Sequence, residues 1–360
     1  MALGSVGKSD GVAANCKGLL KWWSLSVVVM AFAAITCALT GTPADPDLWG
    51  HVRFGQDIVR AGKIVRTDPY SYLTSDQAWI NHEWLSEVIL YEAFALGGAH
   101  GLAVLKLLLD LSGVLCVYLY LRRRAVRIYL AAAMSLLLAI LLLPSLRTVR
   151  PQLFTQLFFT LTMIGLATFD SHERSLLVAM PLCFAIWSNA HGGVLAGILV
   201  VALWCAAESV ALLVRTRRAR ELLSRSHLPK LGATMAILPA TLLNPYGFGL
   251  WRFLLRTATV PRPEITEWQP IPIRSAAGAL YLVLLVTTSA ALLCSRRKRP
   301  MSLLVVYLCT ALLPLTAIRH LPLFAVAAVI IAGEHVEDAW DRWRGPRGRS
   351  PRADLKPWFV

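Results

Sequence analysis

Long apolar stretches separated by short polar segments run along most of the chain. They lie at roughly 22–41, 100–121, 128–144, 152–169, 175–189, 192–214, 231–243, 276–294, 301–318 and 320–333. A helix needs roughly 20 mainly apolar residues to cross a bilayer, and most of these stretches approach that length. The pattern therefore predicts an all-α polytopic membrane protein of about ten transmembrane helices.

The composition agrees with a membrane protein and changes how the charge is interpreted. Of the 360 residues, 56% are hydrophobic and 16% are charged, and soluble domains contain about 25% charged residues. A net charge of +15 would suggest nucleic acid as a partner of a soluble protein. Here the basic residues gather in short loops between apolar stretches, so we expect membrane lipids and no nucleic acid as partners. The seven cysteines form no CxxC pair, which argues against a disulfide framework or a cysteine metal site.

The basic clusters predict the orientation in the membrane. They follow every second span, at 122–127, 172–174, 215–230, 296–299 and 342–352. Because cytoplasmic loops are enriched in Lys and Arg, both termini are expected in the cytoplasm. The predicted division is a cytoplasmic N-terminal segment (1–21), a membrane domain (22–333) and a basic cytoplasmic tail (334–360). The first apolar stretch is long and is followed by further spans, so it is predicted to be an uncleaved helix and not a signal peptide.

The first external loop (42–99) is the longest segment between predicted spans and opens with the sequence DPDLWGH. Asp47 is placed to cap a helix that starts at Leu48 and stops at Gly62. A second helix is expected from near His82 to the break at Gly97-Gly98. Both have the pattern of helices that lie in the membrane interface.

Asp45 and Asp47 are the first candidates for chemistry in this loop. One carboxylate could deprotonate an acceptor hydroxyl, and the other could hold a metal against a phosphate. A simpler interpretation is that Asp47 only caps the helix and Asp45 only stabilises the turn. On that interpretation Asp45 is the less constrained of the two acids.

Other polar side chains at the external ends of spans are candidates for substrate binding. Two histidines and three acids in the first loop could bind a divalent metal, although their spacing matches no known ligand motif. Arginines at span ends suit a lipid phosphate because the guanidinium donates paired hydrogen bonds; contact with lipid headgroups is the alternative. The predicted binding residues are His51, His82, Glu83, Arg147, Arg150, Asn189, His191, Glu267, Arg319 and His320. No cofactor is predicted with certainty.

Lys106 and Asp110 are ionisable residues inside a predicted span. Residues four apart face the same side of a helix, so the two are expected to form an ion pair. Charges inside a membrane are often functional, but a structural pair is the favoured interpretation here.

The layout resembles the GT-C superfamily of integral-membrane glycosyltransferases. The resemblance is carried by DPDLWGHVRFGQDIVRAGKIVRTDPYSY and WINHEWLSEVILYEAFALGG, with RPQ, SNAHGG, LNPYG, ITEW and RHLP further along. It is closest to bacterial protein O-mannosyltransferase-like and aminoarabinose transferase-like enzymes, in an uncharacterised branch. The chain departs from better-known members in having fewer spans and a basic tail in place of a soluble C-terminal domain.

The resemblance implies a transferase that works at the external face of the bacterial cytoplasmic membrane. Its donor would be a polyprenyl-phosphate-linked sugar, and its acceptor a cell-envelope glycan, lipid or protein. A first-loop aspartate would be the base, and transfer would be a single displacement. The alternatives from the residues are a transporter or lipid flippase, which tends to contain internal repeats not found here, and a non-catalytic envelope-assembly protein.

Overall fold

The computed structural model describes residues 6–43 and 45–344 and contains helices and no strand within them. The α-helices are α1 (Val6–Thr40), α2 (Leu48–Ala61), α3 (Trp84–Arg123), α4 (Ile128–Leu146), α5 (Gln152–Ala190), α6 (Val194–Thr216), α7 (Leu228–Ala240), α8 (Phe248–Thr259), α9 (Ala276–Cys294), α10 (Met301–Leu312) and α11 (Leu321–Arg344). Short 3₁₀ turns η1 (Ala219–Leu223), η2 (Thr266–Trp268), η3 (Leu313–Leu315) and η4 (Ile318–His320) lie between them.

Seven helices within the described residues are long and apolar enough to cross a membrane: α1, α3, α4, α5, α6, α9 and the segment containing α11. The chain is therefore a multi-pass membrane protein. Helix α5 loses helical geometry at His172, so the two apolar stretches predicted at 152–169 and 175–189 occupy its two halves. The remaining predicted stretches correspond to α7 and α10, which are shorter.

Helix α11 forms the centre of the bundle. Residues 323–332 are all buried, and the helix packs against α9, α4, α10 and α5. Four alanines and one glycine lie within residues 323–333, and small side chains let neighbouring membrane helices approach closely. At Gly333, a Cβ atom would lie 2.3 Å from a methyl carbon of Leu121. Helix α11 therefore joins several of the spans, and it begins directly after the turn that carries Arg319 and His320.

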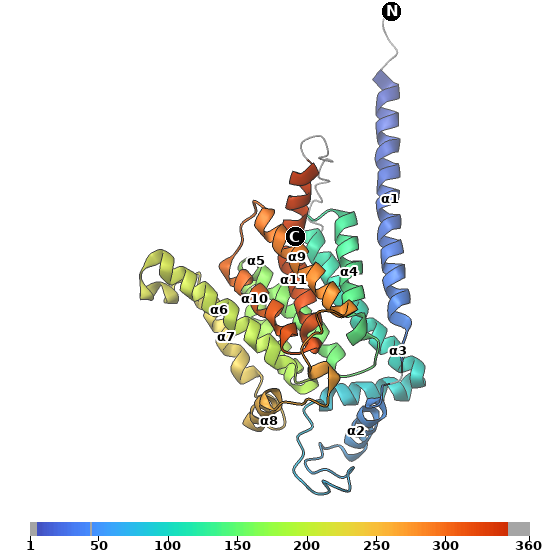
Figure 1. Cartoon of the computed structure of the whole chain (residues 1–360), viewed down its shortest axis with the longest axis vertical. Coiled ribbons are helices and arrows are strands. Elements are labelled where there is room, and N and C mark those ends of the chain that lie inside the picture. Colours follow the sequence, from blue (N-terminus) through green and yellow to red (C-terminus); the bar gives the residue numbers. More distant parts are fainter. Residues whose placement is uncertain (1–5, 44, 345–360) are drawn as a thin grey trace, which may run out of the picture.

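One end of the bundle carries α2, the first part of α3 and α8, while the N-terminal end of α1 and the C-terminal end of α11 point the opposite way (Figure 1). Helix α3 changes direction at Gly97 and Gly98, where the backbone is not helical and Gly98 has φ 57°. Its first part crosses α2 closely, because a Cβ on Gly55 would lie 2.1 Å from the carbonyl oxygen of Glu87. The non-helical backbone at Gly97 and Gly98 confirms the break predicted there.

The predicted bounds of α2 are confirmed, and the structure contains further helix that the sequence did not predict. Helix α2 begins at Leu48 and ends before Gly62, which has φ 63° and donates its N–H to the Ile58 carbonyl. The amphipathic helix α8 was not predicted. Helix α1 begins at Val6 and α11 continues to Arg344, so helix extends into both segments assigned to the N-terminus and the tail. Residues 1–5 and 345–360 of those segments lie outside the described residues.

Candidate functional site

A cavity of about 1330 Å³ lies at the end of the bundle that carries α2 and α8. Ten of the twelve predicted site residues line it: Asp45, Asp47, His51, His82, Glu83, Arg150, His191, Glu267, Arg319 and His320. Apolar side chains from the spans, including Leu141, Leu195 and Leu323, line it as well. The cavity therefore joins a charged part to an apolar part that continues among the membrane helices.

Asp45 and Arg150 form the first charged group of the site. The Asp45 side chain is 2% exposed, and one of its oxygens accepts a hydrogen bond from the Arg150 Nε. Its other oxygen accepts the backbone N–H of Asp47 at 2.9 Å. Arg150 lies just before α5, directly ahead of Pro151, which is the N-cap residue of that helix. The Asp45 carboxylate is thus buried and accepts two hydrogen bonds.

Asp47 occupies a different environment from the one predicted. It stands at the N-cap position of α2, but its side chain makes no capping hydrogen bond. The side chain is 67% exposed and meets Arg150 at 3.4 Å between Oδ2 and Nη2. The prediction that Asp47 caps the helix through its side chain and that Asp45 is the less constrained acid is wrong, because Asp45 takes the bonding role.

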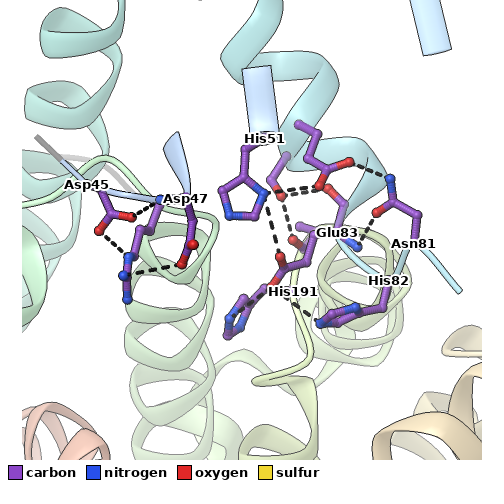
Figure 2. Close-up of polar contacts among 11 residues, drawn as sticks. Asp45, Asp47, His51, Asn81, His82, Glu83 and His191 are labelled. Atoms are coloured by element: carbon purple, nitrogen blue, oxygen red, sulfur yellow. Dashed lines mark hydrogen bonds and ion pairs between the residues drawn. The ribbon is translucent and has the colours of Figure 1, made fainter. Parts of the chain in front are cut away.

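Histidine and glutamate side chains form a second group beside the first (Figure 2). His51 lies one turn after Asp47 on α2, and its Nδ1 is 3.1 Å from Glu87 Oε1 and 3.9 Å from Glu83 Oε2. The other Glu83 oxygen is 3.3 Å from His191 Nε2 and 3.4 Å from His82 Nε2. Ligand atoms of His51, Glu83 and Glu87 lie within 4.8 Å of one another, so they could hold a metal ion.

Hydrogen bonds from neighbouring residues fix this second group. Asn81 donates its amide to Glu87 Oε2 at 2.5 Å, and its carbonyl oxygen accepts the backbone N–H of Glu83 at 3.2 Å. The Ser86 hydroxyl lies 2.7 Å from the Ala190 carbonyl, which joins the start of α3 to the end of α5. The carboxylates are therefore held in place by partners outside the group.

The protonation of three titratable side chains at the cavity, His51, Glu83 and His191, follows from burial and from their neighbours. Burial lowers the pKa of His51, but the hydrogen bond to Glu87 and the charges of Glu83 and Glu87 raise it more, and the net direction is upward. Burial raises the pKa of Glu83, but the contact with His82 and the charges around it bring it below its usual value. Burial lowers the pKa of His191 to about 4, so this imidazole is neutral at pH 7.

A third group contains Arg319, Glu267 and Trp268. The Arg319 guanidinium lies 4.6 Å from the centre of the Trp268 ring, and its Nη1 is 3.8 Å from Glu267. Backbone hydrogen bonds from Ile318 to Gln269 and from Ile271 to Pro314 hold η2 against the turn that carries Arg319. Arg262 lies over the same indole ring at 5.2 Å and also lines the cavity.

Two predicted site residues are not part of the cavity. Arg147 is the C-cap residue of α4, and its exposed side chain does not line the cavity. Asn189 is buried and accepts a hydrogen bond from the Trp84 indole at 2.8 Å, while its own amide donates to two backbone carbonyls. Its role is to join α3, α5 and the segment after α7.

His320 lines the cavity, but its Nδ1 is 3.2 Å from the Leu313 carbonyl, which ties the His320 side chain to the preceding turn, η3.

The sequence analysis missed Glu87, Asn81 and Arg262 as site residues. Glu87 lies within the second helix expected in the first loop, and its burial depends on the close crossing at Gly55. The signal in the sequence was Gly55, one turn after His51 on the same helix, because a glycine permits another helix to approach closely. Away from the site, the expected ion pair between Lys106 and Asp110 is confirmed, with 3.4 Å between Nζ and Oδ2.

Comparison of the chain with protein-family models, curated proteins and solved structures finds no match.

Proposed function

We propose that the protein is a glycosyltransferase that moves a sugar from a polyprenyl-phosphate carrier to a cell-envelope acceptor at the external membrane face. The observation that carries this proposal is the cavity, which combines carboxylates, arginines and an apolar lining drawn from the spans. A donor with a lipid tail, an anionic phosphate and a neutral sugar needs these three environments side by side. The likeness of the sequence motifs to the GT-C superfamily supports the same reaction class.

Asp47 is the proposed base. It lines the cavity, is largely exposed and has one distant ion-pair partner, so an acceptor hydroxyl can reach it. Asp45 is already bonded to Arg150 and to the Asp47 backbone, and its proposed role is to position both of them. A general base must lie within hydrogen-bond reach of the proton it removes, which favours the accessible carboxylate.

Arg319 is the proposed partner of the donor phosphate. Arg150 faces three carboxylates, Asp45, Asp47 and Glu267, whereas Arg319 shares only Glu267 with it among the ion pairs found in the described residues. The guanidinium of Arg319 also stacks on Trp268, which orients its planar face. An oriented guanidinium whose one ion-pair partner is shared with Arg150 suits an anionic phosphate.

The proposed reaction is a single displacement at the anomeric carbon. The acceptor oxygen forms the new bond to that carbon while the bond to the phosphate oxygen breaks. Asp47 takes the proton from the acceptor hydroxyl, and polyprenyl phosphate leaves with the bonding electron pair. Arg319 stabilises the charge that grows on the leaving phosphate.

A flippase would need the same lipid-phosphate contacts without the base, so the experiment must separate the two functions. In cells that lack the gene, the expected result is accumulation of a polyprenyl-phosphate-linked sugar, measured by mass spectrometry of extracted lipids. Wild-type protein should remove the accumulated lipid, and Asp47→Asn should not, although it reaches the membrane at normal levels. Asp76→Asn is the matched control, because Asp76 is exposed, lies outside the cavity and has a positive φ that Asn tolerates.

Asp45→Asn should also impair transfer, because it removes the charge that holds Arg150. Normal envelope glycans and no lipid accumulation in both Asp45→Asn and Asp47→Asn cells would contradict the proposed function. A transport role would leave the Asp47→Asn variant fully active.

A further inference from the structure

Three side chains at one side of the cavity place nitrogen and oxygen atoms around a common point. His51 comes from α2, Glu83 precedes α3, and Glu87 lies in its first turn. His51 Nδ1 lies 3.1 Å from Glu87 Oε1 and 3.9 Å from Glu83 Oε2. We propose that His51, Glu83 and Glu87 bind one divalent transition-metal ion, such as Zn²⁺ or Mn²⁺.

The spacing of these atoms is close to that of a coordination sphere. Nitrogen and carboxylate ligands lie about 2.1 Å from such an ion, so neighbouring tetrahedral ligands are about 3.4 Å apart. The two separations from His51 differ from this value by about 0.3 and about 0.5 Å, and the ligand atoms of the three residues all lie within 4.8 Å of one another. An adjustment of the glutamate side chains brings all three atoms within reach of one ion.

Partners outside the three ligands orient each carboxylate, which is typical of metal sites. Asn81 donates to the Glu87 oxygen that faces away from His51. His191 and His82 contact the Glu83 oxygen that faces away from His51. Each glutamate thus keeps one oxygen directed at the imidazole of His51, and the other oxygen is held by the protein.

His191 is a positioning residue and not a fourth ligand. Its Nδ1 accepts the backbone N–H of Gly193 at 2.9 Å and lies 2.8 Å from the Thr155 hydroxyl. The Thr155 oxygen in turn accepts the Trp187 indole N–H, which leaves its own proton for His191. Because Nδ1 is an acceptor, the neutral ring carries its proton on Nε2 and donates it toward Glu83.

Charge and ligand type indicate which ion binds. Glu87 is 2% exposed, and two adjacent carboxylates of which one is buried are costly without nearby positive charge. One imidazolium on His51 would leave the trio with a net negative charge, whereas a divalent ion would balance both acids. The imidazole suits Zn²⁺ and the two carboxylates suit Zn²⁺ and Mn²⁺, whereas Ca²⁺ and Mg²⁺ prefer sites built from oxygen ligands alone. His51 and Glu83 line the cavity, so the ion is reached from there.

This site rests on the geometry of the three ligands and not on the proposed function. The direct test uses the full-length protein, purified in detergent, stripped with a chelator and dialysed separately against Zn²⁺ and Mn²⁺. The expected result is about one ion per chain by elemental analysis, with Zn²⁺ or Mn²⁺ retained in the presence of excess Mg²⁺. Glu87→Gln should weaken binding by at least about 100-fold, and Asn81→Ala by about 10- to 100-fold, since it removes an outer partner.

Glu92→Gln is the matched control, because Glu92 is an exposed glutamate of the same helix outside the cavity. It should bind the ion as the wild type does. If Glu87→Gln does not fold, pulsed electron paramagnetic resonance of the Mn²⁺-loaded wild type provides the answer without a variant, because it detects a coordinating histidine nitrogen. A stripped wild-type protein that takes up neither ion, equal binding by Glu87→Gln and Glu92→Gln, or bound Mn²⁺ without a nitrogen ligand would overturn the proposal.

Discussion

Both ends of the helix bundle contain dense groups of charged side chains, but the groups are built differently. At the end away from α2, Arg124 bonds to Glu334 at 2.7 Å, Arg127 to Glu337 at 2.5 Å, and Arg297 to Glu334 at 2.9 Å. These pairs join α11 to the segments around α4 and α9, and none of their residues lines the cavity. Their geometry is that of inter-helix links.

At the end that carries α2, acids meet histidines or share one arginine around the cavity. Asp45, Asp47 and Glu267 all approach Arg150, and the two glutamates at the start of α3 face His51. This arrangement surrounds a cavity and leaves Asp47 exposed to it. Charge density alone therefore does not identify a site. Charged side chains that line an open cavity do.

The largest effect is expected when Arg319 is replaced by Ala. If this guanidinium holds the donor phosphate, transfer should fall by about 100-fold, as is usual when a charge-assisted contact to a reacting group is removed. The measurement is the rate of loss of lipid-linked sugar by purified protein in bilayer discs. Arg147→Ala is the matched control, an exposed arginine outside the cavity, and it should keep wild-type activity. Equal rates for the two variants would remove Arg319 from the donor site.

A smaller effect is expected when Gly55 is replaced by Ala. The new Cβ would lie 2.1 Å from the Glu87 carbonyl oxygen, so α2 and α3 must separate at a cost of about 1–3 kcal/mol. Thermal melting in detergent and transfer activity should both decrease. Gly50→Ala on the same helix meets only ordinary contacts at 3.7 Å and should be neutral or stabilising by about 0.5–1 kcal/mol. A Gly55→Ala protein as stable as Gly50→Ala would contradict the close crossing.

The smallest effect is expected at the opposite end of the bundle. Glu337→Gln keeps a hydrogen-bond acceptor for Arg127 but removes the charge, which should lower stability by about 1–2 kcal/mol. The melting temperature should fall while the rate per folded molecule stays at the wild-type value. Glu92→Gln serves as the control for removal of an acidic charge. A loss of rate with unchanged melting would place function at this end as well.

The elements around the site follow from local patterns in the sequence. Leu48 and Gly62 bound α2 because apolar periodicity and a left-handed glycine are readable in a few residues. Gly97 and Gly98 mark the bend in α3 for the same reason. The choice between Arg147 and Arg150 was not readable, since three residues across a helix end change which side an arginine faces.

The roles within the site depend on packing between distant segments. Asp45 and Asp47 differ because Arg150, 105 residues from Asp45 in sequence, bonds to Asp45 and leaves Asp47 exposed. Glu87 joins the site only because Gly55 permits two helices to touch. The Asp45–Arg150 bond leaves no local pattern in the sequence, and Gly55 marks a close approach without identifying the residue that meets it. The residue types could therefore be predicted but not their individual environments.

The most direct measurement of the proposed function is product formation by the purified chain. Full-length protein in bilayer discs is incubated with the lipid extract of cells that lack the gene, and free polyprenyl phosphate is measured by mass spectrometry. The account predicts release of polyprenyl phosphate with wild-type protein and Asp76→Asn, and at least about a 100-fold slower release with Asp47→Asn. Release at the same rate with Asp47→Asn, or no release with the wild type while the lipid-linked sugar is present, would contradict it.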